Sequence, residues 1–187
     1  MDKVNLAAFS TGNFDKGAGE LKIITWYFIN ALLVRASWNP FMSIKIILLR
    51  AFGAKIGRGL AIKNNVTIKF PWKLTIGNNV WLGEQCWIDN LDYVTIGNNV
   101  CISQGALLLT GNHDYTNSSM PYRNAPITLE DGVWVGARVV VCPGVIMRKN
   151  SIASVGSVVT KSTEVNGIYQ GVPAVVIRKR KVCGQTI

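Results

Sequence analysis

The stretch Thr75-Ile76-Gly77-Asn78-Asn79-Val80 returns unchanged as Thr95-Ile96-Gly97-Asn98-Asn99-Val100, 20 residues further along the chain. Such a repeat is analysed before local propensity because it decides the whole architecture. It belongs to a longer pattern with a six-residue step, which matches neither the α-helix, at about 3.6 residues per turn, nor a heptad coiled coil. The pattern predicts a parallel β-helix in which each hexad forms one short side of a triangular coil. The aliphatic residues that carry the step are Ile56, Ile62, Ile68, Ile76, Leu82, Ile88, Ile96, Ile102, Leu108, Leu129, Val135, Val141, Met147, Ala153 and Val159.

The residue after each inward aliphatic position is often small, as expected at a corner. Small residues allow a tight turn and a positive φ, and the asparagines that follow tolerate the left-handed region. The gaps from Ile68 to Ile76 and from Ile88 to Ile96 are eight residues instead of six, so each predicts a two-residue bulge at the same corner of successive coils. We therefore expect about five stacked coils, since a β-sandwich would give no reason for a constant step. The small corner residues are Gly57, Gly77, Gly83, Gly97, Gly136, Ser103 and Ser154.

The charge of the chain is distributed unevenly. At 187 residues the chain is one domain with an appended arm, and its net charge is +10. Residues 1–55 carry seven basic and three acidic side chains, and residues 161–187 carry five and one. Basic ends favour anionic partners, either phosphorylated ligands or a lipid surface. Nucleic acid is not an expected partner, because no recognition motif accompanies the charge.

The cysteines and the N-terminus indicate the compartment. Cys86, Cys101, Cys142 and Cys183 show no C-x-x-C spacing, and the first 20 residues are too polar for a cleavable signal peptide. These features predict free thiols in a reducing environment, and therefore a cytoplasmic location.

Residues 1–55 form the predicted arm, before a β-helix domain at 56–165 and a basic C-terminal tail at 166–187. The apolar runs at 21–34 and 43–52 predict two helical segments broken near Pro40. Neither reaches the roughly 20 apolar residues that span a bilayer. One interpretation is peripheral contact of residues 21–52 with the inner face of a membrane. The other is a cap over the open end of the β-helix, or packing against a neighbouring subunit.

The six-residue step breaks after Leu108, where a polar segment predicts a protruding loop at about 111–126. His113, the one histidine of the chain, lies at the start of this loop between Asn112 and Asp114. Loops on a rigid scaffold often carry functional residues, and an imidazole can accept a proton at neutral pH. His113 is therefore the candidate general base.

Four features resemble the left-handed β-helix, or hexapeptide-repeat, acyltransferases: the repeat, the Gly-Asn-His-Asp break at 111–114, the Trp-Val-Gly-Ala turn at 134–137 and the tail at 171–178. The chain looks most similar to the maltose, galactoside and nodulation O-acetyltransferases. Residues 48–57 resemble the colanic acid and capsular polysaccharide O-acetyltransferases of the WcaF type. The resemblance implies an all-β, left-handed parallel β-helix. The left hand comes from the resemblance alone, since the general crossover rule favours the right hand.

The resemblance also implies a homotrimer with active sites at the subunit interfaces, acetyl-CoA as co-substrate and no metal. His113 would take the proton of an acceptor hydroxyl as that oxygen attacks the thioester. Asn112 and Asp114 would orient the ring or the acceptor, unless they are turn residues, and Trp134 could equally have a packing role. Positions that match the family's CoA contacts are Trp134, Ala137, Val155, Thr160, Lys161, Arg178 and Arg180. Candidate acceptor contacts are Asp89, Asn90, Asn112, Asp114 and Tyr115.

The function that the resemblance implies is acetyl-CoA-dependent O-acetylation of a sugar hydroxyl in polysaccharide or glycolipid biosynthesis. The acceptor would be a saccharide or a lipid-linked saccharide. Two alternatives remain open: an O-acetyltransferase of the same fold that modifies a xenobiotic such as an antibiotic, and a non-catalytic β-helix scaffold. A single histidine excludes the three-histidine zinc site of carbonic anhydrases of this fold.

Overall fold

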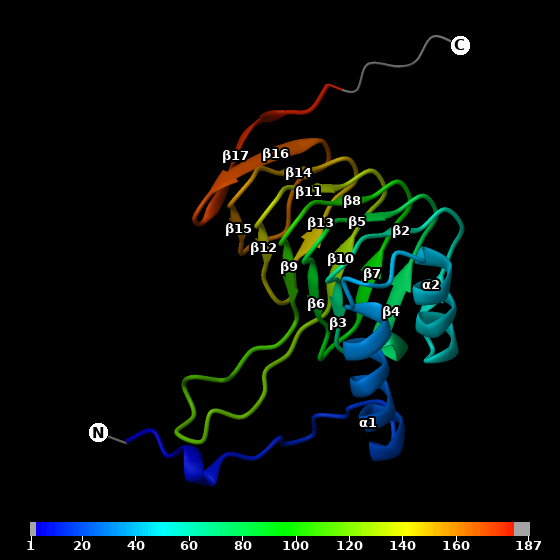
Figure 1. The fold of residues 1–187 in the computed structure, drawn as a ribbon. Helices are drawn as coiled ribbons and strands as arrows, with labels where there is room; N and C mark the ends of the chain where they lie inside the picture. Colours follow the sequence, from blue (N-terminus) through cyan, green and yellow to red (C-terminus); the bar gives the residue numbers. More distant parts are fainter. Residues whose placement is uncertain (1–2, 182–187) are drawn as a thin grey trace.

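The computed structural model describes residues 3–181; residues 1–2 and 182–187, with Cys183, lie outside the described part. Its main body is a triangular prism of stacked coils (Figure 1). Each of its three sides is a parallel sheet with one strand from each coil, so that successive coils pair in register. The first sheet contains β1 (Lys55–Ile56), β4 (Leu74–Ile76), β7 (Val94–Ile96), β10 (Ile127–Leu129) and β13 (Ile146–Met147). The second contains β2 (Ala61–Ile62), β5 (Trp81–Leu82), β8 (Cys101–Ile102), β11 (Trp134–Val135), β14 (Ile152–Ala153), β16 (Gly167–Gly171) and β17 (Ala174–Lys179). The third contains β3 (Thr67–Ile68), β6 (Trp87–Asp89), β9 (Leu107–Leu109), β12 (Val140–Val141) and β15 (Val158–Val159).

The six-residue step places its aliphatic residues inside this prism, as predicted. Ile56, Ile76, Ile96 and Leu129 lie directly above one another in the first sheet. Every residue of the predicted step except Ile56 is at most 2% exposed. Ile56 is half-buried, whereas Ile62 and Ile68 of the same first coil are buried. The core is therefore a column of stacked aliphatic side chains.

The small corner residues serve a different purpose from the one expected. Gly77 and Gly97 do not have a positive φ. A Cβ built on Gly77 would lie 2.7 Å from the carbonyl carbon of Gly97, and one on Gly97 would lie 2.4 Å from Asp131 Oδ1. Glycine is needed at these corners because stacked coils approach too closely for a side chain.

The two asparagines of each repeat have different structural roles. The second asparagine has the predicted positive φ, 55° at Asn79 and 53° at Asn99. The first asparagine joins successive coils: Asn98 Oδ1 accepts a hydrogen bond from the backbone N–H of Asn78 at 2.8 Å. Asp131 Oδ1 accepts the equivalent bond from Asn98 at 2.6 Å. These side chains satisfy backbone donors that the tight corner leaves without a strand partner.

The predicted bulges stack on the corner between the third and first sheets. In the first coil the bulge includes a 3₁₀ turn, η3 (Pro71–Lys73). In the second coil the Asn90 side chain turns inward, accepting from the backbone N–H of Phe70 at 2.9 Å and donating to its carbonyl. Thr110 takes the corresponding place in the third coil and donates to the Asp89 carbonyl at 2.9 Å. The 111–126 loop leaves the prism at this same corner.

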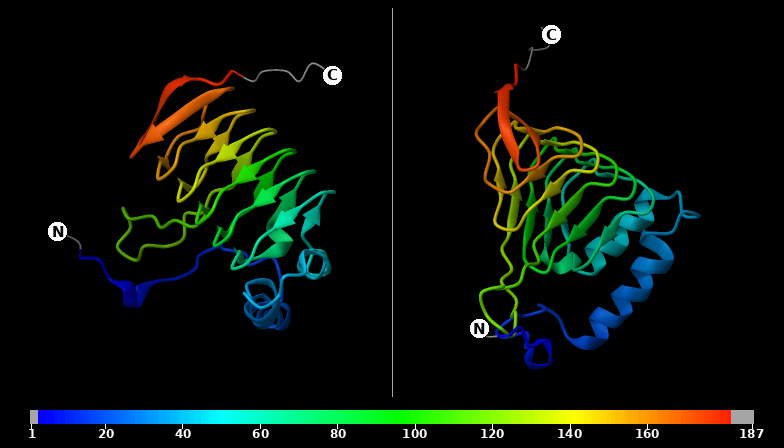
Figure 2. Two further views of the ribbon diagram at one scale, coloured as in Figure 1. Left: turned by 45° about the horizontal axis from the view of Figure 1, so that its top comes forward. Right: turned by 90° about the vertical axis from the view of Figure 1, so that its left-hand side faces the viewer.

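The N-terminal arm closes the first-coil end of the prism. It contains η1 (Leu6–Ala8), α1 (Glu20–Ile29), a π-helical turn η2 (Asn30–Val34) and α2 (Met42–Ala51). Trp26, Val34 and Leu49 enter the core, and the Trp26 indole N–H donates to the Ile68 carbonyl at 3.0 Å. Both views of Figure 2 place α1 and α2 at this end and the β16–β17 pair at the other. Within residues 3–181, no helix is both long and apolar enough to cross a membrane.

The C-terminal segment continues the prism beyond residue 165. β16 pairs in parallel with β14 and begins a sixth coil, and β17 then returns antiparallel along β16. The described part of the predicted basic tail is therefore a strand pair that covers the last coil.

Candidate active site

The loop that carries His113 is a narrow two-limbed ribbon projecting from the prism (Figure 1). Its limbs are joined by backbone hydrogen bonds from Asp114 N to Pro121 O at 2.9 Å, from Arg123 N to Asn112 O at 2.8 Å and by a bridge between His113 and Tyr122. This pairing gives a long excursion a defined backbone, so that the histidine has a defined position.

The hydrogen bond of the His113 ring determines its tautomer. Nδ1 lies 2.7 Å from the Met120 carbonyl oxygen, which can only accept. Nδ1 must therefore carry the proton, and the neutral ring presents Nε2 with a free lone pair. Met120 holds this carbonyl in place with a positive φ of 47°, a conformation that is uncommon for a non-glycine residue. The loop thus presents an imidazole that can accept a proton at Nε2.

Asp89 lies beside His113. A cavity of about 320 Å³ is lined by both residues, together with Lys69, Asn112 and Tyr122. Lys69 Nζ lies 2.9 Å from Asp89 Oδ1. The two meet as an ion pair without hydrogen-bond geometry, and no described residue gives this buried oxygen a hydrogen bond. Asp89 Oδ1 is thus buried against Lys69, which neutralises the carboxylate at the wall of the cavity.

The other predicted acceptor contacts differ in availability. Asn112 lines the same cavity, although its Oδ1 accepts the backbone N–H of His113 at 2.8 Å. Asp114 accepts from the hydroxyl and backbone N–H of Thr116; these bonds hold the pKa of its carboxyl below the ordinary value and mark it as a turn residue. Tyr115 is 78% exposed. Asn90 is fully buried with both ends of its amide bonded to Phe70, so its role is structural.

The sequence reasoning did not include the N-terminal segment in the site. Asn5 N donates to the Ser118 carbonyl at the tip of the loop at 2.9 Å. The Phe9 ring lies 5.9 Å from the His113 ring and 5.4 Å from Tyr122, centroid to centroid. Isolated aromatic residues in a polar stretch were the available signal. The segment before α1 is therefore part of the wall around the histidine.

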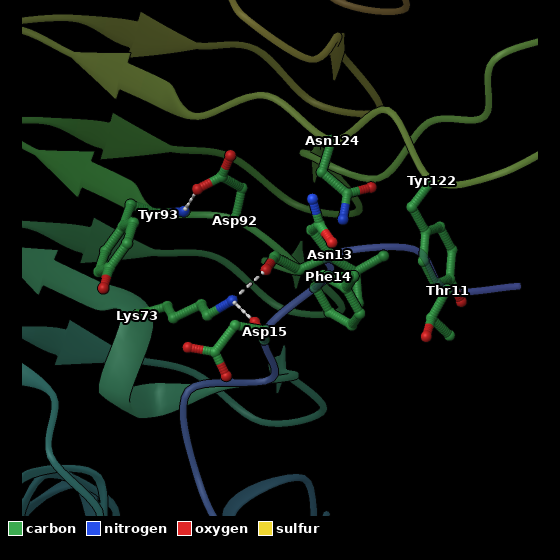
Figure 3. A pocket seen from close by; sticks show the side chains of 10 residues that line it. Thr11, Asn13, Phe14, Asp15, Lys73, Asp92, Tyr93, Tyr122 and Asn124 are labelled. Carbon is green, nitrogen blue, oxygen red and sulfur yellow. Dashed lines mark hydrogen bonds between the residues drawn. The ribbon is translucent and has the colours of Figure 1, made fainter.

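A second cavity, of about 390 Å³, lies where this segment meets the loop and the bulge corner. Asn13 and Asn124 approach one another across it (Figure 3). Lys73 reaches into it and donates to the carbonyls of Leu91 at 2.7 Å and Asp15 at 2.5 Å. Burial lowers the pKa of the Lys73 ammonium from its ordinary value, while the nearby carboxylates of Asp92 and Asp15 oppose that shift. Lys73 thus ties the N-terminal segment to the bulge corner.

Three of the predicted CoA contacts meet in one groove. Trp134, Ala137 and Val155 line a cavity of about 410 Å³ along the second sheet and the corner that follows it. The Trp134 indole N–H donates to Ser103 Oγ at 2.9 Å, which fixes the ring across two coils. A neighbouring cavity of about 670 Å³ shares Ser103 and Gln104, so the groove continues toward the first coil.

The remaining predicted CoA contacts are not in this groove. Thr160 and Lys161 are exposed just after β15, and Arg178 is exposed on β17. The Arg180 guanidinium donates to the carbonyls of Gly132 at 2.9 Å and Asn150 at 3.3 Å, and therefore fastens β17 to the prism.

The histidine and the groove lie on different corners of one chain. The 111–126 loop follows β9 at the corner between the third and first sheets, whereas Ala137 and Val155 lie between the second and third sheets. One side of the prism, formed by the third sheet, separates these corners.

An imidazole on one corner of a parallel β-helix and a groove on another define the class of β-helix group-transfer enzymes. No family model matches the chain. WcaF of Escherichia coli (strain K12), provisionally named a colanic acid biosynthesis acetyltransferase, is 35% identical over 178 residues, or 94% of this chain and 97% of that protein. The galactoside O-acetyltransferase of the same organism is 33% identical over 136 residues, or 71% of this chain and 66% of that protein. The chain belongs to the hexapeptide-repeat acetyltransferase family.

Solved structures agree with this assignment. A hexapeptide-repeat-containing acetyltransferase from Vibrio cholerae O1 biovar eltor, solved with acetyl-coenzyme A, superposes with a TM-score of 0.80 at 20% identity over 93% of this chain and 96% of that chain. A galactoside acetyltransferase solved with coenzyme A superposes with a TM-score of 0.76 at 25% identity over 85% and 80%. The predicted fold class, a left-handed parallel β-helix, is confirmed.

Proposed function

We propose that this protein transfers the acetyl group of acetyl-CoA to a hydroxyl of a saccharide acceptor, with His113 as the general base. The observation that carries the proposal is the bond between His113 Nδ1 and the Met120 carbonyl, because in the neutral ring it places the proton on Nδ1 and the lone pair on Nε2. The cavity that His113 shares with Asp89 and Asn112 is lined by polar side chains, which suits an acceptor that carries hydroxyls. Neutral hydroxyls bound by a carboxylate and an amide suit a sugar better than an apolar substrate.

In the proposed reaction, Nε2 removes the proton of the acceptor hydroxyl while the oxygen forms a bond to the thioester carbonyl carbon. The Met120 carbonyl stabilises the imidazolium that results, because it accepts the Nδ1 proton throughout. Collapse of the tetrahedral intermediate breaks the carbon–sulfur bond, and the leaving thiolate takes the proton back from Nε2. The base is then ready for another cycle without a covalent acyl-enzyme.

For the co-substrate, we propose that pantetheine lies in the groove lined by Trp134, Ala137 and Val155. Coenzyme A and acetyl-coenzyme A are present in the two solved relatives described above. Lys161 and Arg178 are exposed cations toward the last-coil end, where they could meet the phosphates of the nucleotide.

We propose a homotrimer in which the loop of one chain faces the groove of its neighbour. The separation of the two corners within a chain supports this arrangement, because it leaves each chain with two halves of different sites. Closed rotational symmetry then completes three equivalent sites. We also propose a saccharide or lipid-linked saccharide acceptor in polysaccharide or glycolipid assembly, in the cytoplasm. The names of the WcaF and galactoside relatives support the saccharide part of this proposal.

The test measures thiol release from acetyl-CoA with a panel of sugars and glycolipids, for the wild type, His113→Ala and His113→Gln. Both variants should lose about 10²–10⁴-fold in kcat, the usual contribution of a general base. Their affinity for CoA, measured by calorimetry, should stay unchanged because the residues proposed to bind pantetheine and the phosphates are not altered. Turnover retained in the variants would disprove the role of His113. Absence of both CoA binding and thiol release in the wild type would instead favour the scaffold alternative.

A further inference from the structure

The helices that cap the prism expose an apolar surface on the side away from the core. On their inner sides, Trp26, Val34 and Leu49 enter the core. The outer side of most surface helices is polar, but here it carries apolar side chains. Large apolar side chains here are between 41% and 80% exposed. Many large apolar side chains exposed on neighbouring helices mark an interaction surface. We call it the outer apolar face; it comprises Leu21, Ile24, Tyr27, Phe28, Leu32, Trp38, Phe41, Met42, Ile44 and Ile47.

The charge around this face is mostly positive, and Glu20 at the start of α1 is paired with Lys16. Between Glu20 and Glu84 the sequence contains nine lysines and arginines and no acidic residue. Lys45 and Lys73 are buried and Lys69 pairs with Asp89. The six other cations are exposed on the cap and the first coil. They are Lys22, Arg35, Arg50, Lys55, Arg58 and Lys63.

We propose that the outer apolar face docks the protein on the surface of an anionic lipid membrane. Aromatic and aliphatic side chains would enter the headgroup region, and the surrounding cations would attract anionic lipids. The helices are ten residues each, so they would lie in the interface and not span it. The proposal is independent of the acetyltransfer chemistry, although a lipid-linked acceptor would share this surface.

Charge separates this occupant from a second copy of the chain. Two copies meeting through this face about a two-fold axis would place the same cations opposite one another, because a two-fold contact pairs a surface with itself. Like charges in that position oppose association. An anionic bilayer neutralises every one of these cations at once.

The position of the face also suits a surface enzyme. α1 and α2 lie at the first-coil end of the prism, while the loop and the strands that form the groove lie along its sides (Figure 2). A membrane meeting the prism at this end would leave both halves of the site uncovered.

The experiment is flotation of the full-length protein with vesicles of phosphatidylcholine alone or with about 30% phosphatidylglycerol. The wild type should float with the anionic vesicles only. Arg35→Glu with Lys55→Glu should weaken that binding at least about tenfold, and Phe28→Ser with Ile47→Ser should abolish it. Neither pair touches the catalytic loop or the groove.

Two matched controls complete the experiment. Arg138→Glu with Lys149→Glu makes the same change in net charge away from the cap, and Val165→Ser removes an exposed apolar side chain at the other end; both should bind like the wild type. Thermal melting of each variant should match that of the wild type, because only exposed side chains change. Equal binding to both kinds of vesicle, or none, would overturn the proposal. A drop in oligomeric mass in Phe28→Ser with Ile47→Ser would overturn it in favour of a second copy.

Discussion

A mixing experiment tests whether one active site is built from two chains. One variant, His113→Ala, removes the candidate base but leaves the groove intact. The other, Val155→Trp, fills the groove but leaves the loop intact; Val155 is 72% exposed, so the larger side chain projects into the groove without disturbing the core. Each variant alone should be inactive, because every site in it lacks one half.

The expected recovery follows from the two corners. In a trimer assembled at random from equal amounts of the two variants, a site is intact when its loop comes from a Val155→Trp chain and its groove from a His113→Ala chain. Each condition is met in half of the cases, so about one quarter of all sites should be intact before fractionation, and about one third in the isolated mixed trimers. A site contained within one chain would recover nothing, because no chain carries both intact halves.

The assay is acceptor-dependent thiol release from acetyl-CoA after coexpression of the two variants from one cell, with separate affinity tags to isolate mixed oligomers. A mixture of His113→Ala with His113→Gln is the matched control and should stay inactive, since no intact loop is present. Mixed oligomers that remain inactive, while the wild type treated identically is active, would refute the shared site. Activity of either variant alone would refute the assignment of that half.

Two further predictions concern the cap and the corners. Trp26→Ala should lower the free energy of unfolding, measured in urea, by about 3–5 kcal/mol, because it leaves a cavity in the core. Phe28→Ala, on the outer side of the same helix, should lower it by less than about 0.5 kcal/mol. Equal effects of the two substitutions would show that α1 does not cap the prism. Hydrogen bonds from the backbone and side chain of Asn98 lower the pKa of the Asp131 carboxyl. The contribution of Asp131 to stability should therefore be present above pH about 4 and be lost as the pH falls through the lowered pKa. In Asp131→Asn, that part of the acid dependence of the melting temperature should disappear.

The repeat and its exceptions were sufficient to predict the prism and the location of the loop. The inward position of Ile76 or Leu108 follows from a rule that each hexad repeats, so it can be read from the local sequence. The break in the step also predicted where the loop leaves the coil, because an insertion can be added only at a corner. The glycine corners were predicted for an incorrect reason: their backbone approaches the next coil, a contact that does not exist within one hexad.

The site was predicted only in part. His113, Trp134, Ala137 and Val155 were identified through a family resemblance, since single polar or small residues have no periodicity of their own. The inward turn of Asn90 depends on Phe70 in the previous coil, and the placement of Phe9 against His113 joins segments about a hundred residues apart.

The sequence by itself determined the coil, its inward residues and the point at which His113 leaves it, because a period that recurs every hexad specifies the same local geometry each time. Only the tertiary structure decided which surface forms the groove, which side of α1 and α2 is exposed, and that the N-terminal segment borders the histidine. These features depend on the number of residues between corners and on contacts between segments that are distant in the sequence. Neither can be read from the residues of a single hexad.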